Sequence, residues 1–226
     1  QNRDQREVDA EKRLIQSVFK VNQAALDWFR KNLLQEHNPL ANKYLPERGI
    51  TPEISERFQL GASLDSWDAL KKHLLGLGFS EDILVDAGLC VRSERGRVYD
   101  KFRNRLMFPI LDANGRVCGF GGRQLVKDDK SPKYMNSAET IVYKKSRILY
   151  GLNLAKEEII NSGYAVLCEG YMDVVICHAF GHPQAVASLG TSLTREQARL
   201  LKRFAARTYF LYDGDPAGQR AMLRGG

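Results

Sequence analysis

The feature that most constrains this chain is an alternation of apolar runs and polar turns between residues 164 and 218. The first apolar run, Tyr164 to Cys168, stops abruptly at Glu169. It is followed by a helical pattern, a second apolar run, an amphipathic stretch and a third apolar run, at residues 173–179, 184–187, 194–204 and 208–212. This alternation predicts a parallel sheet with crossover helices, which is an α/β architecture.

Three acidic residues come directly after two of these runs. Glu169 follows the first run, and Asp213 and Asp215 follow the third. Ligands of parallel sheets gather outside the carboxyl ends of the strands, so we expect the three carboxylates to share one rim. Asp213 and Asp215 would point to the same side about 7 Å apart and repel each other by about 2 kcal/mol at an effective dielectric of about 20. A divalent cation reverses that repulsion, and oxygen ligands suit magnesium or manganese rather than zinc.

The alternative interpretation of these acids is structural. Asp213-Gly214-Asp215 could be a solvated turn, because such tripeptides are common in loops, and Glu169 could be an exposed loop acid. The residue types alone leave both interpretations open.

The order of the motifs resembles the TOPRIM domain shared by bacterial primases, topoisomerases and some nucleases. The segments that carry the resemblance are EGYMDVV, ASLGTSLT and YDGDPAG, and they resemble the primase branch in particular. The resemblance implies that Glu169 is the essential acid and that Asp213 and Asp215 form the metal-binding pair. It also places Asp173 as a further acid near the metal ions, with Mg²⁺ or Mn²⁺ as cofactor.

Charge is concentrated in one quarter of the chain. The formal net charge is +7, yet residues 92–147 hold fourteen Lys and Arg against six Asp and Glu. This localised basic block favours a polyanionic partner. We find neither a signal peptide nor an apolar stretch that could span a membrane, so we expect a cytosolic protein without a membrane partner.

The cysteines predict neither a metal site nor a disulfide framework. The four residues, Cys90, Cys118, Cys168 and Cys177, are widely spaced, without a Cys-x-x-Cys motif. Cys168 lies in an apolar run and is expected to be a small core residue.

The first ninety residues predict helices. Residues 6–36 carry apolar side chains at helical spacing, which predicts one long helix or two, and Asn38-Pro39 ends that pattern. Three shorter helices are expected further on, with Thr51, Ser66 and Ser80 as their N-terminal caps.

The basic block instead predicts strands. Apolar runs at residues 105–111 and 116–120 flank Asn114-Gly115, which is a strong signal for a two-residue hairpin turn. Pro109 cannot donate a ladder hydrogen bond and marks an edge or a bulge. Glycines 119, 121 and 122 would let the backbone approach something closely just before Arg123, although they could equally fit a crowded bend.

A proline-bearing loop follows, with Lys133, Tyr134 and Asn136 around it and Lys145 shortly after. Basic side chains with interleaved tyrosines suit phosphate contacts with occasional base stacking. The alternative is a charged, solvated loop.

Here the resemblance extends beyond the TOPRIM region. YDKFRNRLMFPILDANGRVCGFGGR, SPKYMNSAET and YKKSRILYGL are similar to the amino-terminal basic subdomain of the RNA polymerase core of bacterial DnaG-type primases, in the family's order. We therefore expect an α+β basic subdomain at residues 1–160, followed by a TOPRIM domain at 161–226. The basic positions that match those lining the family's template and nucleotide groove are Arg48, Arg123, Lys133 and Lys145, with Arg103 and Arg105 as less close matches.

The family implies a function in replication: synthesis of short RNA primers on single-stranded DNA from NTPs, with a replicative helicase as partner, in the bacterial cytoplasm at the nucleoid. The family's zinc ribbon and its helicase-binding domain have no counterpart in residues 1–226, and the family continues past the acids of the third run. We therefore expect a fragment truncated within its TOPRIM domain, with zinc and the helicase contact in domains outside it.

Other TOPRIM proteins provide the alternative functions. A topoisomerase would need a tyrosine nucleophile on a separate gate domain, and none can be assigned. A nuclease could use the same acids and metal ions to activate water. A non-enzymatic recombination mediator would bind DNA without metal and is not expected to carry the basic block.

Overall fold

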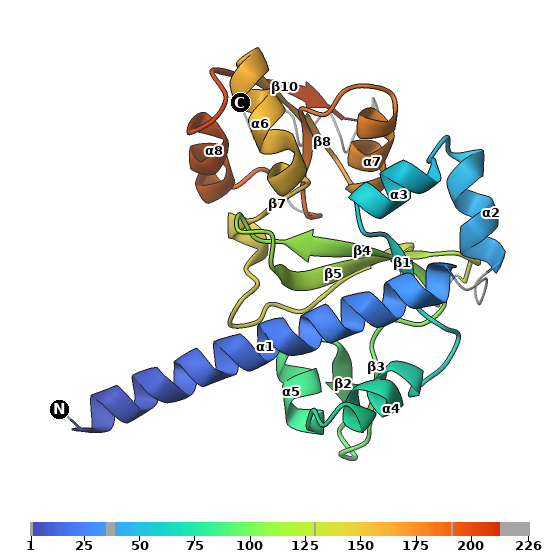
Figure 1. The fold of residues 1–226 in the computed structure, drawn as a ribbon, viewed down its shortest axis with the longest axis vertical. Helices are drawn as coiled ribbons and strands as arrows, with labels where there is room; N and C mark the ends of the chain where they lie inside the picture. Colours follow the sequence, from blue (N-terminus) through green and yellow to red (C-terminus); the bar gives the residue numbers. More distant parts are fainter. Residues whose placement is uncertain (1, 35–38, 129, 191, 213–226) are drawn as a thin grey trace. The chain divides into compact units, whose positions relative to one another are not determined.

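The computed structural model describes residues 2–34, 39–128, 130–190 and 192–212. The chain forms two compact units (Figure 1). The first unit contains residues 1–42, 59–109 and 116–143, and the second contains residues 43–58, 110–115 and 144–226. Both units therefore draw on separated parts of the chain, and a single boundary at residue 160 stays a prediction about the family's subdomains.

A four-stranded sheet covered by a long helix forms the first unit. The sheet has the order β1-β4-β5-β6, with antiparallel pairing in β1–β4 and β5–β6. Its elements, with the small β2–β3 sheet, are α1 (Asn2–Leu34), β1 (Gly61–Ala62), α4 (Ala69–Gly76), α5 (Glu81–Asp86), β2 (Cys90–Arg92), β3 (Val98–Asp100), β4 (Arg105–Leu111), β5 (Val117–Gln124) and β6 (Tyr134–Asn136). In Figure 1, α1 runs across this sheet, with α4 and α5 beyond it.

α1 confirms the predicted amphipathic helix and provides much of the core. Val18, Leu26 and Phe29 are buried along one face, and the Phe29 ring meets the edge of Phe120 at 5.2 Å between centroids. Each such side chain contributes about 1.5–3 kcal/mol through burial. Gly61 lies so close to α1 that a Cβ there would meet Phe29 at 2.6 Å. Within the described ranges, no helix is both long and apolar enough to cross a membrane.

Helix capping agrees with the sequence at two of three places. The Thr51 and Ser80 hydroxyls cap α3 (Pro52–Arg57) and α5 as predicted, each accepting a backbone N–H three residues on at 3.4 Å. α4 differs, because Asp68 is its N-cap residue and gives no side-chain cap.

The N-terminus of α4 is instead held by Asp100, thirty residues along the chain. Its carboxylate accepts hydrogen bonds from the backbone N–H groups of Leu70 and Lys71 at 2.8 and 2.9 Å, while Ser66 accepts those of Asp68 and Ala69. A negative charge at a helix N-terminus is favourable, although burial raises the pKa of Asp100 above its ordinary value.

The hairpin of β4 and β5 forms, but its turn is longer than predicted. β4 ends at Leu111 and β5 begins at Val117. The Asp112 side chain accepts the Asn114 N–H at 2.9 Å, and Gly115 takes a positive φ of 78°. The two-residue turn is therefore wrong, because Asp112 provides a local hydrogen bond that supports a wider turn. Pro109 lies beyond the residues of β4 that pair with β1, where its missing N–H costs no ladder bond on that side.

The second unit has the predicted α/β architecture. Strand order is β10-β8-β9-β7, with β8 parallel to both neighbours and β7 antiparallel to β9. Its elements include α3, the single-turn η1 (Lys145–Arg147), β7 (Leu149–Tyr150), α6 (Leu152–Ser162), β8 (Tyr164–Cys168), α7 (Tyr171–Ala179), β9 (Ala185–Ser188), α8 (Arg195–Lys202) and β10 (Arg207–Leu211). Helix α2 (Pro39–Glu47) spans the division between the two units.

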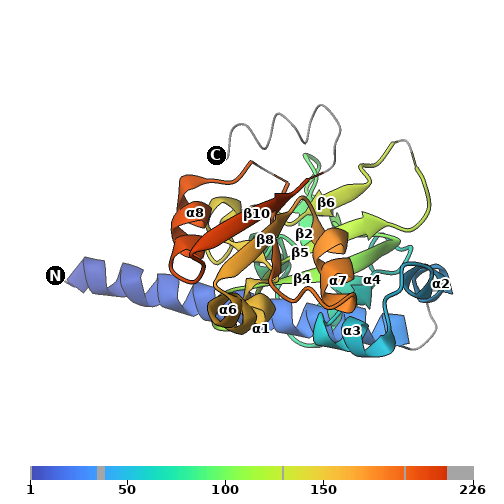
Figure 2. The same cartoon turned by 90° about the horizontal axis from the view of Figure 1, so that it is seen from above.

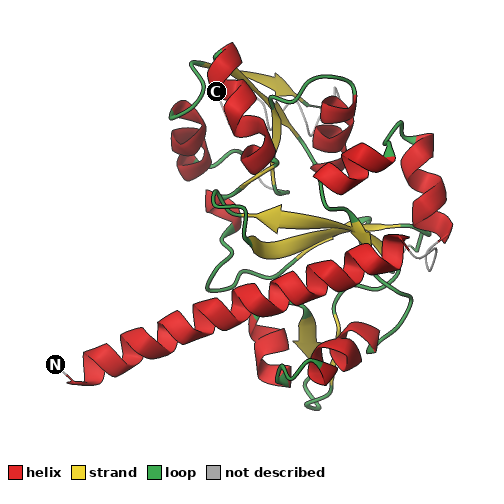
Figure 3. Cartoon of the chain, viewed as in Figure 1, coloured by secondary structure: helices red, strands yellow, loops and turns green. Residues whose placement is uncertain are grey.

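Crossover helices connect the parallel strands, as the alternation of patterns predicts: α7 joins β8 to β9, and α8 joins β9 to β10 (Figure 3). Leu152 and Ile159 of α6 and Leu201 of α8 share one core with β8 and β9. α7 packs against β9 and α3 (Figure 2). Cys168 is fully buried at the end of β8, which confirms it as a core residue.

Candidate functional site

Glu169 lies directly after β8, the strand between β9 and β10 in the sheet. Within β8, Ala165, Leu167 and Cys168 are buried and the other two residues are half-buried. Glu169, which follows, is also only half-buried. The apolar run therefore ends where the carboxylate emerges from the core. This is the carboxyl end of a parallel strand, the position at which ligands of α/β sheets bind.

Two other strands bring polar side chains to the same end of the sheet. Leu211 of β10 is paired with Cys168 of β8, so the next residue, Tyr212, follows β10 where Glu169 follows β8. Burial raises the pKa of Tyr212, the nearby Glu169 carboxylate adds to the effect, and a hydrogen bond with the side chain of Ser188 opposes it. Glu169, Ser188 and Tyr212 therefore converge at the carboxyl ends of three strands.

Asp173 has a local structural role that the sequence did not indicate. It is the third residue of α7, and its Oδ2 accepts the backbone N–H of Gly170 at 2.9 Å. This bond satisfies one of the donors left open at a helix start, and the positive end of the α7 dipole favours an ionised acid there.

The predicted metal pair, Asp213 and Asp215, lies outside the described residues. Among the described residues, no three His, Cys, Asp or Glu side chains come together to hold a metal ion. Glu169 fits a hard cation as an oxygen donor at a strand end, and Tyr212, the last described residue of the third run, stands beside it. The metal-binding roles of Asp213 and Asp215 stay predictions.

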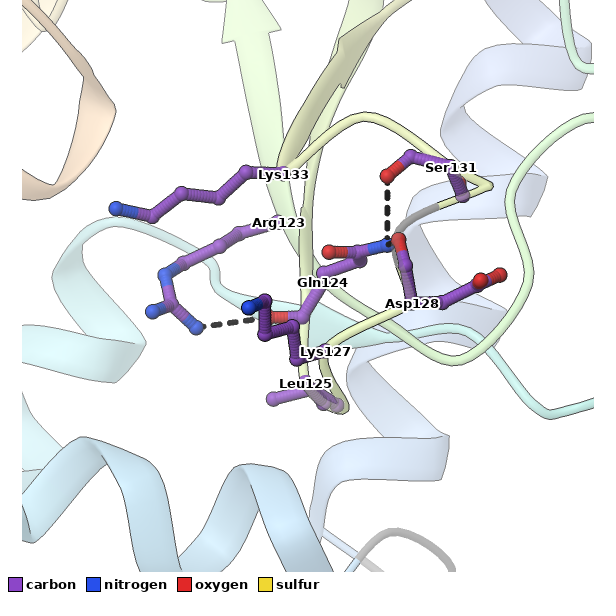
Figure 4. A pocket seen from close by; sticks show the side chains of 7 residues that line it. All are labelled: Arg123, Gln124, Leu125, Lys127, Asp128, Ser131 and Lys133. Atoms are coloured by element: carbon purple, nitrogen blue, oxygen red, sulfur yellow. Dashed lines mark hydrogen bonds between the residues drawn. The ribbon is translucent and has the colours of Figure 1, made fainter.

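A cationic pocket of about 510 Å³ lies in the first unit, near the end of β5 (Figure 4). Three of its side chains are basic and one is acidic. The lining residues are Arg123, Gln124, Leu125, Lys127, Asp128, Ser131 and Lys133. The pocket thus brings together Arg123 and Lys133, two of the basic residues that the sequence predicts for phosphate contacts.

Gln124 shapes this pocket from the end of β5. Its Nε2 donates to the carbonyls of Asp128 and Ser131, both at 2.9 Å, and its backbone N–H donates to the Lys133 carbonyl at 2.9 Å. Arg123 Nη1 donates to the Gln124 carbonyl at 2.8 Å. The loop between β5 and β6 is therefore attached to β5 at several points, which gives Lys133 a defined place.

Tyr134 and Asn136 lie on β6, beside β5. The register pairs Arg123 with Tyr134 and Gly121 with Asn136. Lys133 Nζ lies 5.8 Å from the centroid of the Tyr134 ring, within the range of a cation–π interaction. Tyr134 is exposed, as a residue available for stacking must be.

Arg105 is buried rather than exposed, with 2% of its surface accessible. Its Nη1 donates to the carbonyls of Gly122 and Lys133 at 3.1 and 3.4 Å, and its Nη2 donates to the Ser131 hydroxyl and the Pro132 carbonyl at 2.5 and 3.0 Å. Burial lowers the pKa of this guanidinium, which nevertheless stays protonated.

Arg103, two residues earlier, is placed differently. Its guanidinium stacks on the Trp67 ring at 3.7 Å from the centroid, and it donates to the Asp100 carbonyl at 2.6 Å. Trp67 is 55% exposed, so this pair presents an aromatic and a cationic group at the surface of the first unit. Sequence reasoning missed Trp67 because a lone tryptophan carries no spacing signal.

The other two predicted basic residues belong to the second unit. Arg48 follows α2 in an exposed turn and lies 5.2 Å from the Tyr44 ring centroid. Lys145 begins η1 and is half-buried. The structure therefore brings together Arg123 and Lys133 in one pocket of the first unit, whereas Arg48 and Lys145 belong to the second unit.

The segment that carries Lys145 is held by α8. Gln197 Nε2 donates to the carbonyls of Lys145 and Ile148 at 2.9 and 2.8 Å, and the Thr194 hydroxyl donates to the Ser146 carbonyl at 2.6 Å. Thr194 and Gln197 also form the capping box of α8. The same two side chains therefore cap α8 and hold the segment that carries Lys145. The sequence pattern did not predict this link.

Together, a mainly parallel sheet with an acid after an inner strand and a separate unit with a cationic pocket define a protein with a Toprim-like domain and a basic domain. The family described as Toprim-like matches residues 166–225. The family described as DNA primase catalytic core, N-terminal domain, matches residues 28–156. The chain belongs to the DNA primase catalytic core family.

Relatives and solved structures agree with this assignment. The chain is 45% identical over 208 residues to the DNA primase of Clostridium acetobutylicum, covering 92% of this chain and 34% of the relative. It is 45% identical over 223 residues to the DNA primase of Deinococcus radiodurans, covering 97% and 38%. The chain thus spans little more than a third of the length of these relatives.

The fold is that of a DnaG catalytic core. A solved structure of a DnaG primase catalytic domain bound to single-stranded DNA matches with a TM-score of 0.86 and 39% identity. The match covers 94% of this chain and 68% of that one. The predicted architecture, a basic subdomain followed by a Toprim domain, is confirmed.

Proposed function

We propose that this chain is the part of a DNA primase that binds the template and provides some of the catalytic residues. The enzyme would make short RNA primers on single-stranded DNA. The likeness to a DnaG catalytic domain bound to single-stranded DNA, over 94% of the chain, carries the proposal. The cationic pocket in the first unit supports it, because polynucleotide affinity rests on basic side chains that meet phosphates.

In this proposal a primer 3′-hydroxyl attacks the α-phosphate of an incoming NTP. A new oxygen–phosphorus bond forms, the bond between the α-phosphorus and the leaving oxygen breaks, the hydroxyl proton passes to solvent, and pyrophosphate leaves. Negative charge accumulates on the phosphate oxygens, so positioning and electrostatic stabilisation account for most of the catalysis. Glu169, Asp213 and Asp215 would hold Mg²⁺ or Mn²⁺, which supplies the positive charge that neutralises the triphosphate.

Glu169 would act from the end of β8, where the half-buried carboxylate can complete the ligand set or orient the hydroxyl. Asp173 would stabilise the start of α7 and thereby the backbone that carries Glu169. The two acids thus have separate tasks, one toward the metal and one toward the helix.

On the basic side, Arg123 and Lys133 would hold phosphates of template or nucleotide in their shared pocket. Tyr134 would stack on a base, and Asn136 would add a polar contact from the same strand. Arg48, Arg103 and Lys145 would each add a phosphate contact. Template affinity should therefore fall steeply as salt concentration rises.

The remaining partners follow from the family. NTPs would be substrates, RNA primers would be products, and a replicative helicase would be a partner through a segment other than residues 1–226. Zinc would likewise belong to another segment. Replication places such an enzyme at the bacterial nucleoid in the cytoplasm.

The test is incorporation of labelled ribonucleotides on unprimed single-stranded DNA with Mn²⁺, for the chain and for its Glu169→Gln and Asp213→Asn variants. Both variants should lose synthesis by at least about 100-fold, because a metal ligand is lost, yet bind template within about twofold. Glu196→Gln, at an exposed acid on α8, is the matched control and should behave like the unsubstituted chain.

Because the chain spans little more than a third of its relatives, the same variants should also be placed in the Clostridium acetobutylicum primase with this chain replacing its 45% identical counterpart. Synthesis that survives Glu169→Gln in that protein contradicts the proposed role. DNA degradation that needs the acids but no nucleotides would establish the nuclease alternative instead.

A further inference from the structure

Arg105 is attached to the first unit through its backbone as well as its side chain. Its N–H donates to the Ser63 hydroxyl at 3.0 Å, and its carbonyl accepts the Ser63 N–H at 2.9 Å. It is the first residue of β4, an inner strand of the sheet. The guanidinium therefore extends from a fixed point in the sheet.

The acceptors of the Arg105 guanidinium lie in two separate segments. One is the Gly122 carbonyl of β5, and the other three belong to consecutive residues, Ser131, Pro132 and Lys133. A planar guanidinium has its donors in a rigid fork, so four bonds to these segments define how far apart they lie. Arg105 thus ties the end of the β5–β6 loop to the strand that carries Arg123.

Gly122 provides the space for this side chain. A Cβ at position 122 would meet Arg105 Cδ at 2.9 Å and Phe102 Cδ1 at 3.0 Å. The glycine-rich stretch before Arg123 predicts that something approaches the backbone closely, and at Gly122 the approaching group is Arg105.

The hydrogen bonds of Arg105 affect the lining of the pocket, because Lys133 is the last residue of the segment that they hold. Arg123 and Lys133 both line the pocket, and Figure 4 shows their side chains extending in the same direction. Two like charges in one pocket repel each other. A loop that was free to move would relieve that repulsion by carrying Lys133 away from Arg123.

The charge of Arg105 contributes as well. Its four acceptors are three carbonyls and one hydroxyl, all of them neutral. The charge lies among residues of low accessibility next to the pocket lining, where it is screened less than a surface charge. It therefore adds to the positive potential that an anion meets.

We propose that Arg105 is a positioning residue for the phosphate-binding pocket: it holds Ser131–Lys133 against β5 so that Lys133 and Arg123 meet the same polyanion. This inference rests on the proposed function, since it assigns that pocket to phosphate groups. It replaces the prediction that Arg105 itself contacts nucleic acid, because its donors are directed to the protein.

The first experiment measures binding of unprimed single-stranded DNA by fluorescence anisotropy for Arg105→Lys, Lys133→Met and the double variant. Lysine keeps the charge but cannot reach four acceptors, so affinity should fall about tenfold, as it should in Lys133→Met. If Arg105 acts through Lys133, the double variant should bind no more weakly than Lys133→Met. Losses that multiply in the double variant overturn the proposal.

A second variant reaches the same tie without changing Arg105. Gly122→Ala should displace the Arg105 stem and weaken binding in the same way, again without further loss in the Lys133→Met background. Arg92→Lys is the matched control, because Arg92 lies in the basic block but pairs with Asp82 at the surface. Its affinity should equal that of the unsubstituted chain.

Hydrogen exchange separates failure of the inference from failure of the proposed function. The Gln124 N–H donates to the Lys133 carbonyl, so Arg105→Lys should speed exchange at Gln124 by at least about tenfold while β8 keeps its protection. Unchanged exchange at Gln124 overturns the positioning role whatever the DNA result. If exchange rises but neither Arg105→Lys nor Lys133→Met alters DNA binding, the pocket does not bind phosphate and the proposed function loses its basic site.

Discussion

Two basic segments of this protein are held in place by opposite kinds of side chain. Ser131–Lys133 in the first unit is held by Arg105, whose guanidinium is charged and 2% exposed. Lys145–Ile148 in the second unit is held by Gln197, whose amide is neutral and fully buried, together with the Thr194 hydroxyl. In both cases the acceptors are mostly backbone carbonyls of the segment that carries a lysine.

The difference lies in what each arrangement contributes besides hydrogen bonds. Burying a guanidinium costs desolvation energy but leaves a positive charge beside a pocket that is already cationic. A buried amide adds no net charge, and Gln197 caps α8 with the same side chain. We call the Arg105 guanidinium the charged clamp and the Gln197 amide the neutral clamp. The charged clamp orders its segment and also attracts an anion, whereas the neutral clamp orders its segment and also stabilises α8.

The two units can be followed separately, because both tryptophans of the chain, Trp28 and Trp67, belong to the first unit. Tryptophan fluorescence therefore reports unfolding of the first unit, and far-UV circular dichroism reports both.

The largest effect is expected for Arg105→Met. The substitution keeps most of the stem but leaves the carbonyls of Gly122, Pro132 and Lys133 without this donor, which should lower the free energy of unfolding of the first unit by about 3 kcal/mol. The measurement is a urea titration followed by tryptophan fluorescence. A loss below about 1 kcal/mol would mean that the desolvation energy regained on removing the guanidinium offsets the lost hydrogen bonds. Arg105 would then contribute its positive charge to the pocket but no net stability.

The neutral clamp should matter less. Gln197→Leu removes donors to the carbonyls of Lys145 and Ile148 and one half of the α8 capping box, so we expect a loss of about 2 kcal/mol in the second unit. Circular dichroism should report this loss while the tryptophan transition stays in place. A shift of the tryptophan transition of equal size would show that the two units unfold together.

Thr194→Ala tests the cap alone. The hydroxyl accepts the Gln197 N–H at 3.1 Å and donates to Ser146, and its loss should cost about 1 kcal/mol. Thr194→Ser keeps the hydroxyl and is the control, with a change within about 0.5 kcal/mol. Equal losses in both variants would attribute the effect to the methyl group instead.

The smallest stability effects, and the most specific binding effects, belong to the lysines themselves. Lys133→Met and Lys145→Met should each change the free energy of unfolding by no more than about 0.5 kcal/mol. Each should reduce the slope of log affinity against log salt for single-stranded DNA by about 0.7, the value for one lost phosphate contact.

Lys12→Met, at an exposed position of α1, is the control for these slopes and should leave them unchanged. If Lys145→Met behaves like Lys12→Met while Lys133→Met does not, only the segment with the charged clamp binds the template. That outcome would confine the binding surface to the first unit.

Local patterns in the sequence were sufficient for much of the fold and for part of the site. The apolar run that stops at Glu169 predicts a strand with an acid at its carboxyl end, and β8 confirms it. Thr51 and Ser80 cap the helices that they precede. These features depend on residues within one turn or one strand, so spacing alone carries the information.

The turn between β4 and β5 marks a limit of local reasoning. Asn114-Gly115 favours a two-residue turn, but the Asp112 side chain supports a wider one. The competing hydrogen bond is also local, and the sequence offered no measure of which of the two would prevail.

The sequence by itself thus determined the starts of α3 and α5, the acid at the carboxyl end of β8, and that the middle of the chain is basic. Only the tertiary structure decided which distant segments Asp100, Arg105 and Gln197 hold, because Leu70, Gly122 and Lys145 lie 30, 17 and 52 residues away from them. Such pairings follow no period, since a buried carbonyl or helix N-terminus needs a partner but accepts it from any part of the chain that folding brings close.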